Sequence, residues 1–259
     1  MKASARVLDP RKRYNLPRGL CAFAVMTKVP RAGRVKTRLT PLLTAQEAAS
    51  LNICFLRDTT AAIASVAREA AARGIAVYTP VGAESEYDAI VPEEFQLLPQ
   101  RGDSLGERLA FATEDLLSIG FEAVCLLDSD SPTVPPRVFL EAARMLARQE
   151  DSIVLGPSDD GGYYLIGLKK LHWTLFENIQ WSTEHVLKQT IKRAEEIDLE
   201  VHLLPTWYDV DEEVTLRRLC RELFTFNGAA PDAYPALVTR EYLEKLLRGE
   251  GRERIWSNG

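Results

Sequence analysis

Apolar residues follow two different spacings along this chain, and each spacing predicts a different kind of element. Short apolar runs that end in Gly, Pro or Asp are typical of strands buried in a sheet. Apolar residues that recur every three or four positions are typical of amphipathic helices. The runs predict strands within 19–26, 75–80, 95–99, 122–130, 152–168 (strand, loop, strand) and 200–205. The helical spacing predicts helices within 44–74, 104–120, 135–149, 182–196, 211–223 and 240–249.

Polar residues at the helix ends support these boundaries. Thr44 with Glu47, and Ser104 with Glu107, have the spacing of a capping box, in which each side chain bonds to the other residue's backbone N–H. Gly74 follows the last apolar position of the first helix and is predicted to end it.

Strands that alternate with helices predict an α/β fold, in which a mostly parallel sheet lies between two layers of helices. We expect a basic, loosely held arm over 1–19, one large domain over 20–225 and a helical tail over 226–259. The carboxyl ends of parallel strands meet at one edge of a sheet, where ligands of this fold class bind. This rule places the loop after Met26 beside the acidic segments that follow the strands at 122–130 and 200–205.

Charge is distributed unevenly, and this changes the interpretation of the loop after Met26. The chain has a net charge of −5, yet residues 1–46 carry +10 and residues 47–259 carry −15. The loop contains five cations and no acid: Lys28, Arg31, Arg34, Lys36 and Arg38. The acidic remainder argues against nucleic-acid binding, which needs a broad basic face. A small anionic ligand held at this one loop fits better, the alternative being a solvated surface loop.

The residue types in this loop are those that bind phosphate. Gly33 allows a close backbone approach, and Thr37 offers a hydroxyl. Lys28 and Lys36 are point charges, whereas Arg38 is a planar fork. The spacing is neither that of a Walker A loop nor G-x-G-x-x-G. We expect a nucleotide to be bound by the five residues just named: Lys28, Gly33, Lys36, Thr37 and Arg38.

Two pairs of acids follow predicted strands and are candidate metal ligands. Asp128 and Asp130 end the apolar run at 124–127, and Asp209 and Asp211 come just before a helix. Carboxylate oxygens suit Mg²⁺ or Mn²⁺, and such ions also bind substrate phosphates. The alternative is turn chemistry and helix capping, for which Asp211 is well placed.

Further polar residues lie in two glycine-containing loops. Asp159 and Asp160 precede two glycines, and either acid could serve as a general base or bind acceptor hydroxyls. A hairpin turn of the Asp-Gly kind explains the same residues. Gly102 and Asp103 precede a helix N-terminus, where Asp103 could contact a base or ribose, or simply cap the helix.

Other residues are expected to be structural. Asp58 lies near the apolar face of the first helix and needs a partner, for which Arg38 is the candidate. The cysteines are far apart, in apolar segments, and are expected to be reduced core thiols: Cys21, Cys54, Cys125 and Cys220. No apolar run approaches the length of about 18 residues needed to span a bilayer, and we expect a cytoplasmic protein without a membrane partner.

Five ordered motifs, MTKVPRAGRVKTRLTP, GDSLGERL, SDSPT, GPSDDGGYYLIGL and DVDEEVTLRRL, give the chain a family resemblance over roughly residues 20–225. It resembles the rSAM/selenodomain-associated transferase 1 family, of the nucleotide-diphospho-sugar transferase (GT-A) superfamily. More distantly it is similar to 2-phospho-lactate guanylyltransferases and molybdenum-cofactor nucleotidyltransferases. The resemblance implies a GT-A fold, nucleotide binding by Gly33, Lys36 and Arg38, and a metal at Asp130 and Asp211. Asp128 departs from the family, which usually has a small residue there.

Two reactions are consistent with a nucleotide–metal site. In the first, an NTP transfers its NMP group to a phosphorylated small-molecule acceptor and pyrophosphate leaves. In the second, an NDP-sugar transfers its sugar and NDP leaves. Lys36, Arg38, Asp130 and Asp159 are the expected catalytic residues. A non-catalytic nucleotide-binding protein is a third hypothesis, and the sequence does not identify the base, the acceptor or the oligomeric state.

Overall fold

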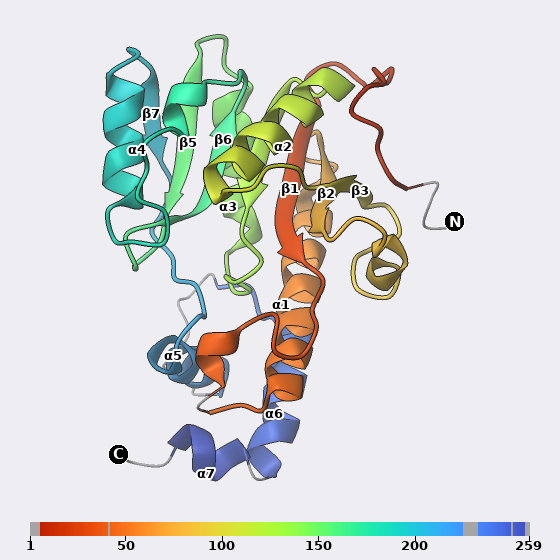
Figure 1. Ribbon diagram of the computed structural model, residues 1–259, viewed down its shortest axis with the longest axis vertical. Helices are drawn as coiled ribbons and strands as arrows, with labels where there is room; N and C mark the ends of the chain where they lie inside the picture. Colours follow the sequence, from red (N-terminus) through yellow and green to blue (C-terminus); the bar gives the residue numbers. More distant parts are fainter. Residues whose placement is uncertain (1–5, 41, 225–232, 250, 257–259) are drawn as a thin grey trace.

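The computed structural model of the chain contains a seven-stranded sheet in the order β3-β2-β1-β4-β6-β5-β7 (Figure 1). It describes residues 6–40, 42–224, 233–249 and 251–256. The strands are β1 (Cys21–Lys28), β2 (Ala72–Thr79), β3 (Gln96–Pro99), β4 (Ala123–Leu127), β5 (Ser152–Pro157), β6 (Tyr163–Leu168) and β7 (Glu200–Leu203). β6 is antiparallel to both neighbours, and the other pairings are parallel. The predicted mostly parallel sheet is therefore confirmed.

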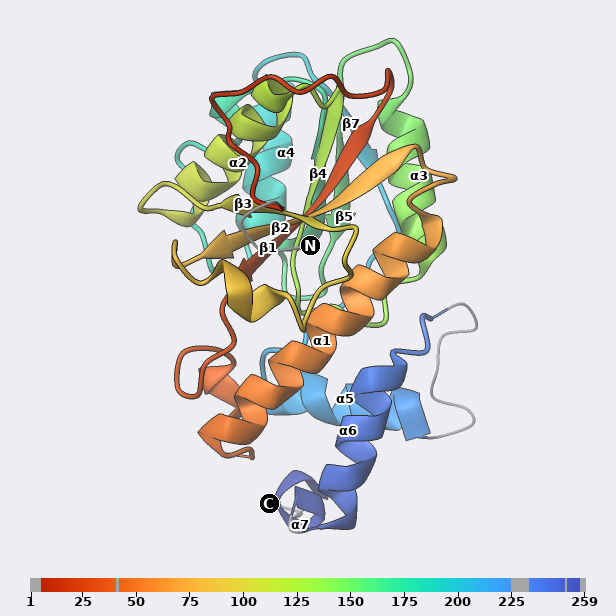
Figure 2. The ribbon, with the colours of Figure 1, turned by 90° about the vertical axis from the view of Figure 1, so that its right-hand side faces the viewer.

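Helices cover both faces of this sheet, which confirms the three-layer α/β fold (Figure 2). The helices are α1 (Ala45–Val66), α2 (Leu105–Ile119), α3 (Pro136–Leu146), α4 (Val186–Glu195), α5 (Glu213–Phe224), α6 (Leu237–Arg248) and α7 (Gly251–Trp256). Alternate residues of β1 serve the two cores. Phe23 and Val25 face α1 and α3, whereas Ala22 and Ala24 face α2. This alternation is the period-two pattern of a strand buried on both faces.

The start of the first helix agrees with the sequence, but its end does not. Both predicted capping boxes form, at Thr44–Glu47 and at Ser104–Glu107. Helix α1 ends at Val66, and Gly74 lies inside β2 rather than at the end of the helix. A Cβ on Gly74 would lie 2.3 Å from the ring of Phe95. The glycine therefore serves close packing against an aromatic side chain and is not a helix stop.

The N-terminal segment packs against the sheet at residues 6–8, which the expectation of a loosely held arm did not include. The Arg6 side chain is 4 % exposed and donates hydrogen bonds to the carbonyls of Phe95 and Pro92. Val7 forms a bridge to Leu97 at the edge of the sheet, and Leu8 is buried. This segment therefore covers the β3 edge that an unpaired strand would expose.

A third apolar core lies below the sheet, where α5, α6 and α7 surround the N-terminal half of α1 (Figure 2). Leu39 of the basic loop is fully buried in it, together with Leu51, Phe55 and Leu243. The predicted helix within the tail is confirmed as α6. Since the tail helices share a core with the basic loop, they fix that loop from beneath. The domain boundary near residue 225 stays a prediction.

Asp58 binds helix α6 rather than Arg38. Its carboxylate accepts hydrogen bonds from the backbone N–H groups of Val238 (3.1 Å) and Thr239 (2.7 Å). Burial raises the pKa of Asp58 above its ordinary value, and these hydrogen bonds oppose that rise. An acid on α1 thus supplies the cap that α6 lacks at its own N-cap residue, Ala236.

The four cysteines are free and buried, as expected. Among the helices that the structure describes, none is both long enough and apolar enough to span a bilayer.

We expect Asp58→Ala to lower the free energy of unfolding by about 1–3 kcal/mol, because two buried N–H groups lose their acceptor. Asp58→Asn keeps an acceptor oxygen and should lose less. Urea unfolding of both variants and the parent measures the difference. Equal stability of all three proteins would show that Asp58 does not hold α6 in place.

Candidate functional site

A divided cleft lies at the carboxyl ends of β1 and β4. Strand order reverses between these two neighbouring strands, and such a switch point is where α/β sheets bind ligands. The cleft consists of cavities of about 450 Å³ and about 270 Å³. Met26, Leu105 and Asp211 line both cavities, so the two are adjoining parts of one site.

The smaller cavity lies on the β1–β2 side. Its polar lining comes from the strand ends, from the loops after them and from helices α1 and α2: Thr27, Lys28, Lys36, Asn52, Thr79, Gln100, Arg108, Ser129 and Asp130. Gln100 donates from Nε2 to the carbonyls of Thr27 and Val77, which fixes its side-chain amide. The smaller cavity is therefore bordered by three cations, Lys28, Lys36 and Arg108, and by the fixed side-chain amide of Gln100.

The larger cavity lies on the β4–β6 side. Apolar and aromatic side chains line it: Leu105, Leu109, Leu126, Leu127, Ile166, Tyr163, Tyr164, Trp181 and Val186. Its charged lining is mostly acidic: Arg38, Asp128, Asp160, Glu184, Asp209 and Asp211. The two halves of the cleft therefore differ in the sign of their charge.

Lys36 connects the two predicted metal-binding segments. Its Nζ lies 2.7 Å from a carboxylate oxygen of Asp130 and 2.7 Å from one of Asp211, and it donates to the carbonyl of Val210 at 2.8 Å. The Lys36 side chain is 2 % exposed, and its backbone is left-handed (φ 49°). An ammonium group has three N–H donors, so all of them are used here.

Electrostatics explain why this buried ammonium stays charged. Burial alone would lower the pKa of Lys36, but the charges of Asp130 and Asp211 outweigh it, and the pKa is raised. For Asp130, burial has the opposite effect and raises the pKa of the carboxyl group, although the charge of Lys36 opposes that rise. The three side chains form one ion cluster between the loops after β1 and β4 and the turn before α5.

The other two predicted metal ligands lie deeper in the larger cavity. Asp128 accepts hydrogen bonds from the Asp130 N–H and the Ser131 hydroxyl, which is the turn chemistry considered as the alternative. Burial and the neighbouring Asp130 charge raise the pKa of Asp128 well above its ordinary value. Asp209 accepts from Ser158, and burial raises its pKa too. All four predicted acids thus border one cleft.

The donor chemistry of this cluster fits a hard divalent ion, because carboxylate oxygens of Asp130 and Asp211 point to a common position. The Lys36 ammonium lies at that position. Among the residues that the structure describes, no group of three or more His, Cys, Asp or Glu is arranged as a metal site. Metal binding by Asp130 and Asp211 is therefore a proposal, and Lys36 would share these carboxylates with the ion.

The cations of the basic loop are only partly free for a ligand. Arg31 pairs with Glu86, and Arg38 lies 3.8 Å from Glu212, so acids distant in sequence neutralise part of the loop. Lys28 and Arg34 have no ion pair within the described part of the chain. Lys28, Lys36 and Arg38 line the cleft, whereas Gly33 (φ 72°) and Thr37 lie outside both cavities.

Asp160, and not Asp159, faces the larger cavity. Asp159 pairs with Arg218 of α5, whose guanidinium lies over the Tyr208 ring. Asp160 lines the cavity and accepts a hydrogen bond from the Gly162 N–H. Of the two acids considered as a base, the structure brings only Asp160 into the site.

Gly102 and Asp103 lie outside both cavities. Gly102 is left-handed (φ 104°), and its carbonyl accepts a hydrogen bond from Arg108. The Asp103 N–H bonds to Glu107, which extends the capping box of α2. Of the two roles considered for Asp103, the structure therefore agrees with helix capping and not with contact to a ligand in either cavity.

Several residues of the cleft carried no clear signal in the sequence: Gln100, Arg108, Tyr163, Trp181 and Glu184. Tyr163 follows the Asp-Asp-Gly-Gly motif and could have been found from it. Trp181 and Glu184 belong to a connection before α4 whose position depends on tertiary packing.

Comparisons with known proteins agree with this architecture. Residues 62–183 match the model of the family DUF2064, described as an uncharacterized protein conserved in bacteria. A provisionally assigned nucleotide-diphospho-sugar transferase from Desulfovibrio desulfuricans G20 is similar in structure, with 29 % sequence identity, a TM-score of 0.73, and coverage of 86 % of this chain and 97 % of that one. The finer resemblance to the rSAM-associated family stays a prediction.

Two further solved structures are more weakly similar. A cytidylyltransferase from Leptospira borgpetersenii serovar Hardjo-bovis has 11 % identity, a TM-score of 0.49, and coverage of 92 % of this chain and 98 % of that one. Rv0371c from Mycobacterium tuberculosis H37Rv, in complex with manganese, has 18 % identity, a TM-score of 0.42, and coverage of 77 % and 97 %. No curated protein matches the chain.

We expect Lys36→Met to lower the free energy of unfolding by about 1–3 kcal/mol, because two partly buried carboxylates lose their counter-ion. The loss stays below that of a fully buried pair because both acids are partly exposed. Lys28→Met removes an exposed, unpaired cation from the same loop and should leave stability within about 0.5 kcal/mol of the parent. Urea unfolding compares the two. An equal effect of both substitutions would contradict a structural role for the ion cluster.

Proposed function

We propose that this protein is a nucleotide-dependent transferase, with nucleotidyl transfer as the first candidate reaction. One observation carries the proposal: a cleft at the switch point of the sheet, cationic in one half and acidic in the other, with Lys36, Asp130 and Asp211 at the junction. A reaction that joins an anionic donor to a different acceptor needs two such adjoining subsites. The structural similarity to the Desulfovibrio desulfuricans protein, at 29 % identity, also supports a transferase.

The smaller cavity is the proposed nucleotide subsite. Lys28 and Arg108 place positive charge in this cavity, where phosphate groups would lie, and Arg38 adds a guanidinium from the lining of the adjoining larger cavity. The Gln100 amide, fixed by two backbone carbonyls, presents its oxygen as an acceptor toward a base or ribose. Lys36 acts by holding the Asp130 and Asp211 carboxylates in place.

Asp130 and Asp211 are the residues that would hold Mg²⁺ or Mn²⁺. Such an ion, when bound, neutralises phosphate charge and stabilises a leaving phosphate group. The rest of the contribution comes from the chain itself, because phosphoryl transfer depends mainly on positioning and charge stabilisation.

In nucleotidyl transfer, an oxygen of the acceptor forms a bond to the α-phosphorus of an NTP. The bond from that phosphorus to the β-bridging oxygen breaks, and pyrophosphate leaves. If the acceptor oxygen is a hydroxyl, its proton must also leave, and it passes to a carboxylate that lines the acceptor side of the cleft. Lys28 and Arg38 would stabilise the charge on the leaving pyrophosphate.

Glycosyl transfer is the second candidate, and two observations favour it. The structure with the TM-score of 0.73 carries a nucleotide-diphospho-sugar transferase assignment. Acids that neutralise Arg31, Lys36 and Arg38 also weaken the case for a triphosphate, since they leave fewer free cations than the sequence implied.

A donor assay separates these reactions. The protein is incubated with Mn²⁺ and either mixed NTPs or NDP-sugars, with and without the small-molecule fraction of a cell extract, and products are separated by anion-exchange chromatography. We expect pyrophosphate from an NTP. NDP from an NDP-sugar, without pyrophosphate, would replace the first candidate by the second. A protein that turns over neither donor class, with or without extract, would contradict the transferase proposal.

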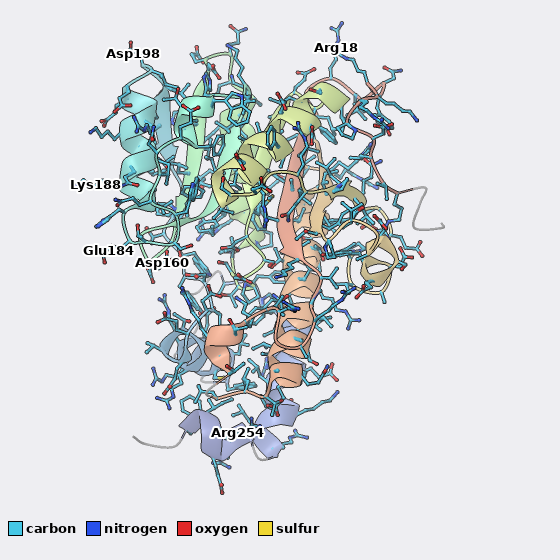
Figure 3. The ribbon with its side chains drawn as sticks, viewed as in Figure 1. Arg18, Asp160, Glu184, Lys188, Asp198 and Arg254 are labelled. Carbon is cyan, nitrogen blue, oxygen red and sulfur yellow. The ribbon has the colours of Figure 1, made fainter. Side chains whose placement is uncertain are left out.

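Asp130→Asn should lower kcat for the accepted donor by about 100-fold or more, because a neutral amide is a much weaker ligand for the divalent ion that would neutralise the phosphate groups. The substitution keeps the side-chain shape but leaves Lys36 with one counter-ion instead of two, so the free energy of unfolding should also fall by about 1–3 kcal/mol, and kcat is measured well below the unfolding midpoint. Asp198→Asn, an exposed substitution distant from the cleft (Figure 3), is the matched control. Full activity of Asp130→Asn would remove this residue from the reacting site.

A further inference from the structure

The larger cavity has the shape and lining of a site for an apolar body. Leu105, Leu109 and Ile166 form its apolar wall. Tyr163 and Trp181 stand edge to face, with ring centroids 6.5 Å apart and planes at 81°. At about 450 Å³, the cavity is within the range of small-molecule sites, which are lined mainly by apolar and aromatic groups.

Two carboxylates stand together on the rim of this cavity. Asp160 comes from the loop between β5 and β6, and Glu184 from the connection before α4 (Figure 3). The two segments are in backbone contact, because a Cβ on Gly161 would lie 2.3 Å from the Glu184 carbonyl oxygen. Gly161 also has a φ of +88°, which a glycine adopts without strain. The close contact fixes both acids on one rim.

Within the described residues, no ion pair involves Asp160 or Glu184; Asp160 accepts one hydrogen bond from the Gly162 N–H. Arg38 is the cation in the described lining of the cavity, and it already lies near Glu212. A divalent ion at Asp130 and Asp211 would leave the rim acids uncompensated.

This charge distribution opposes a phosphorylated acceptor. A phosphate group in the larger cavity would face Asp160, Glu184 and Asp209 with one shared arginine in compensation. An ammonium group at the same place would gain from both rim acids and from the nearby aromatic faces.

We propose that the larger cavity binds the acceptor, and that the acceptor is a hydroxyl compound with an apolar body and an ammonium group, without a phosphate. The inference rests on the proposed function in one respect, because only a transferase has an acceptor. It replaces the phosphorylated acceptor expected from the sequence. The apolar body lies between Leu105, Tyr163 and Trp181. The ammonium group lies at Asp160 and Glu184, and the hydroxyl points toward the junction with the nucleotide subsite.

Three probes with the same body and different charge test this preference: 2-phenylethylammonium, 2-phenylethanol and 2-phenylethyl phosphate. Their dissociation constants are measured by ligand-observed NMR on the full chain without nucleotide. We expect the ammonium probe to bind about tenfold more tightly than the alcohol, as two partly exposed charge contacts allow. The phosphate probe should bind more weakly than the alcohol.

Variants assign the effect to the rim. Glu184→Gln and Asp160→Asn should each reduce the advantage of the ammonium probe by about threefold and leave the affinity for the alcohol unchanged. Glu195→Gln makes the same charge change on an exposed position of α4 outside the cavity, and it should have no effect. Trp181→Leu should weaken the ammonium and alcohol probes together.

The inference is overturned if the phosphate probe binds most tightly, if charge makes no difference, if no probe binds, or if Glu195→Gln acts as the rim variants do. Because these measurements report binding without turnover, they are independent of the donor assay. A protein that prefers the ammonium probe but turns over no donor would retain the charge preference of the cavity and contradict the transferase proposal instead.

Discussion

The contact on which the site depends is the buried ion cluster of Lys36, Asp130 and Asp211. It joins three segments far apart in the chain: the loop after β1, the loop after β4 and the turn before α5. Lys36 makes it in a left-handed backbone conformation, which costs a non-glycine residue about 1–3 kcal/mol. Three charge-assisted or backbone hydrogen bonds to one ammonium offset that cost. The cluster therefore sets where the two halves of the cleft meet.

The C-terminal helices are the physical support of this cluster. Leu39 lies three residues after Lys36 and is buried in the core that α5, α6 and α7 build against α1. Asp58, on that same helix α1, caps α6 and so attaches the tail to the main sheet domain. A strongly basic loop in an otherwise acidic chain is thus packed into the fold, because Leu39 lies in a core while Lys28, Lys36 and Arg38 line the cleft.

The sequence was sufficient for the fold and for the expectation that four acids and part of the basic loop border one cleft. Apolar runs and capping boxes are local signals, and the sheet, both capped helices and the convergence of the four acids follow from them. The predictions that failed concern residues whose role is set by tertiary contacts with residues distant in the sequence. Gly74 looked like a helix stop because the ring of Phe95 that covers it is distant in sequence. Asp159 and Asp160 are equivalent in sequence, and only Arg218 of α5 draws one of them away from the cavity.

The same limit applies to charge, with a larger consequence for function. Counting cations in the basic loop implied a strong excess for phosphate, but Glu86, Asp130, Asp211 and Glu212 neutralise much of it in space. What remains is a contrast across the cleft among the residues that the structure describes: Lys28, without an ion pair there, borders one half, and Asp160 and Glu184, also without one, border the other. A field that changes sign over one cleft draws an anionic donor to one half and repels it from the other. Under the proposed function, this contrast would orient donor and acceptor toward the junction at Lys36, Asp130 and Asp211, where a group would be transferred.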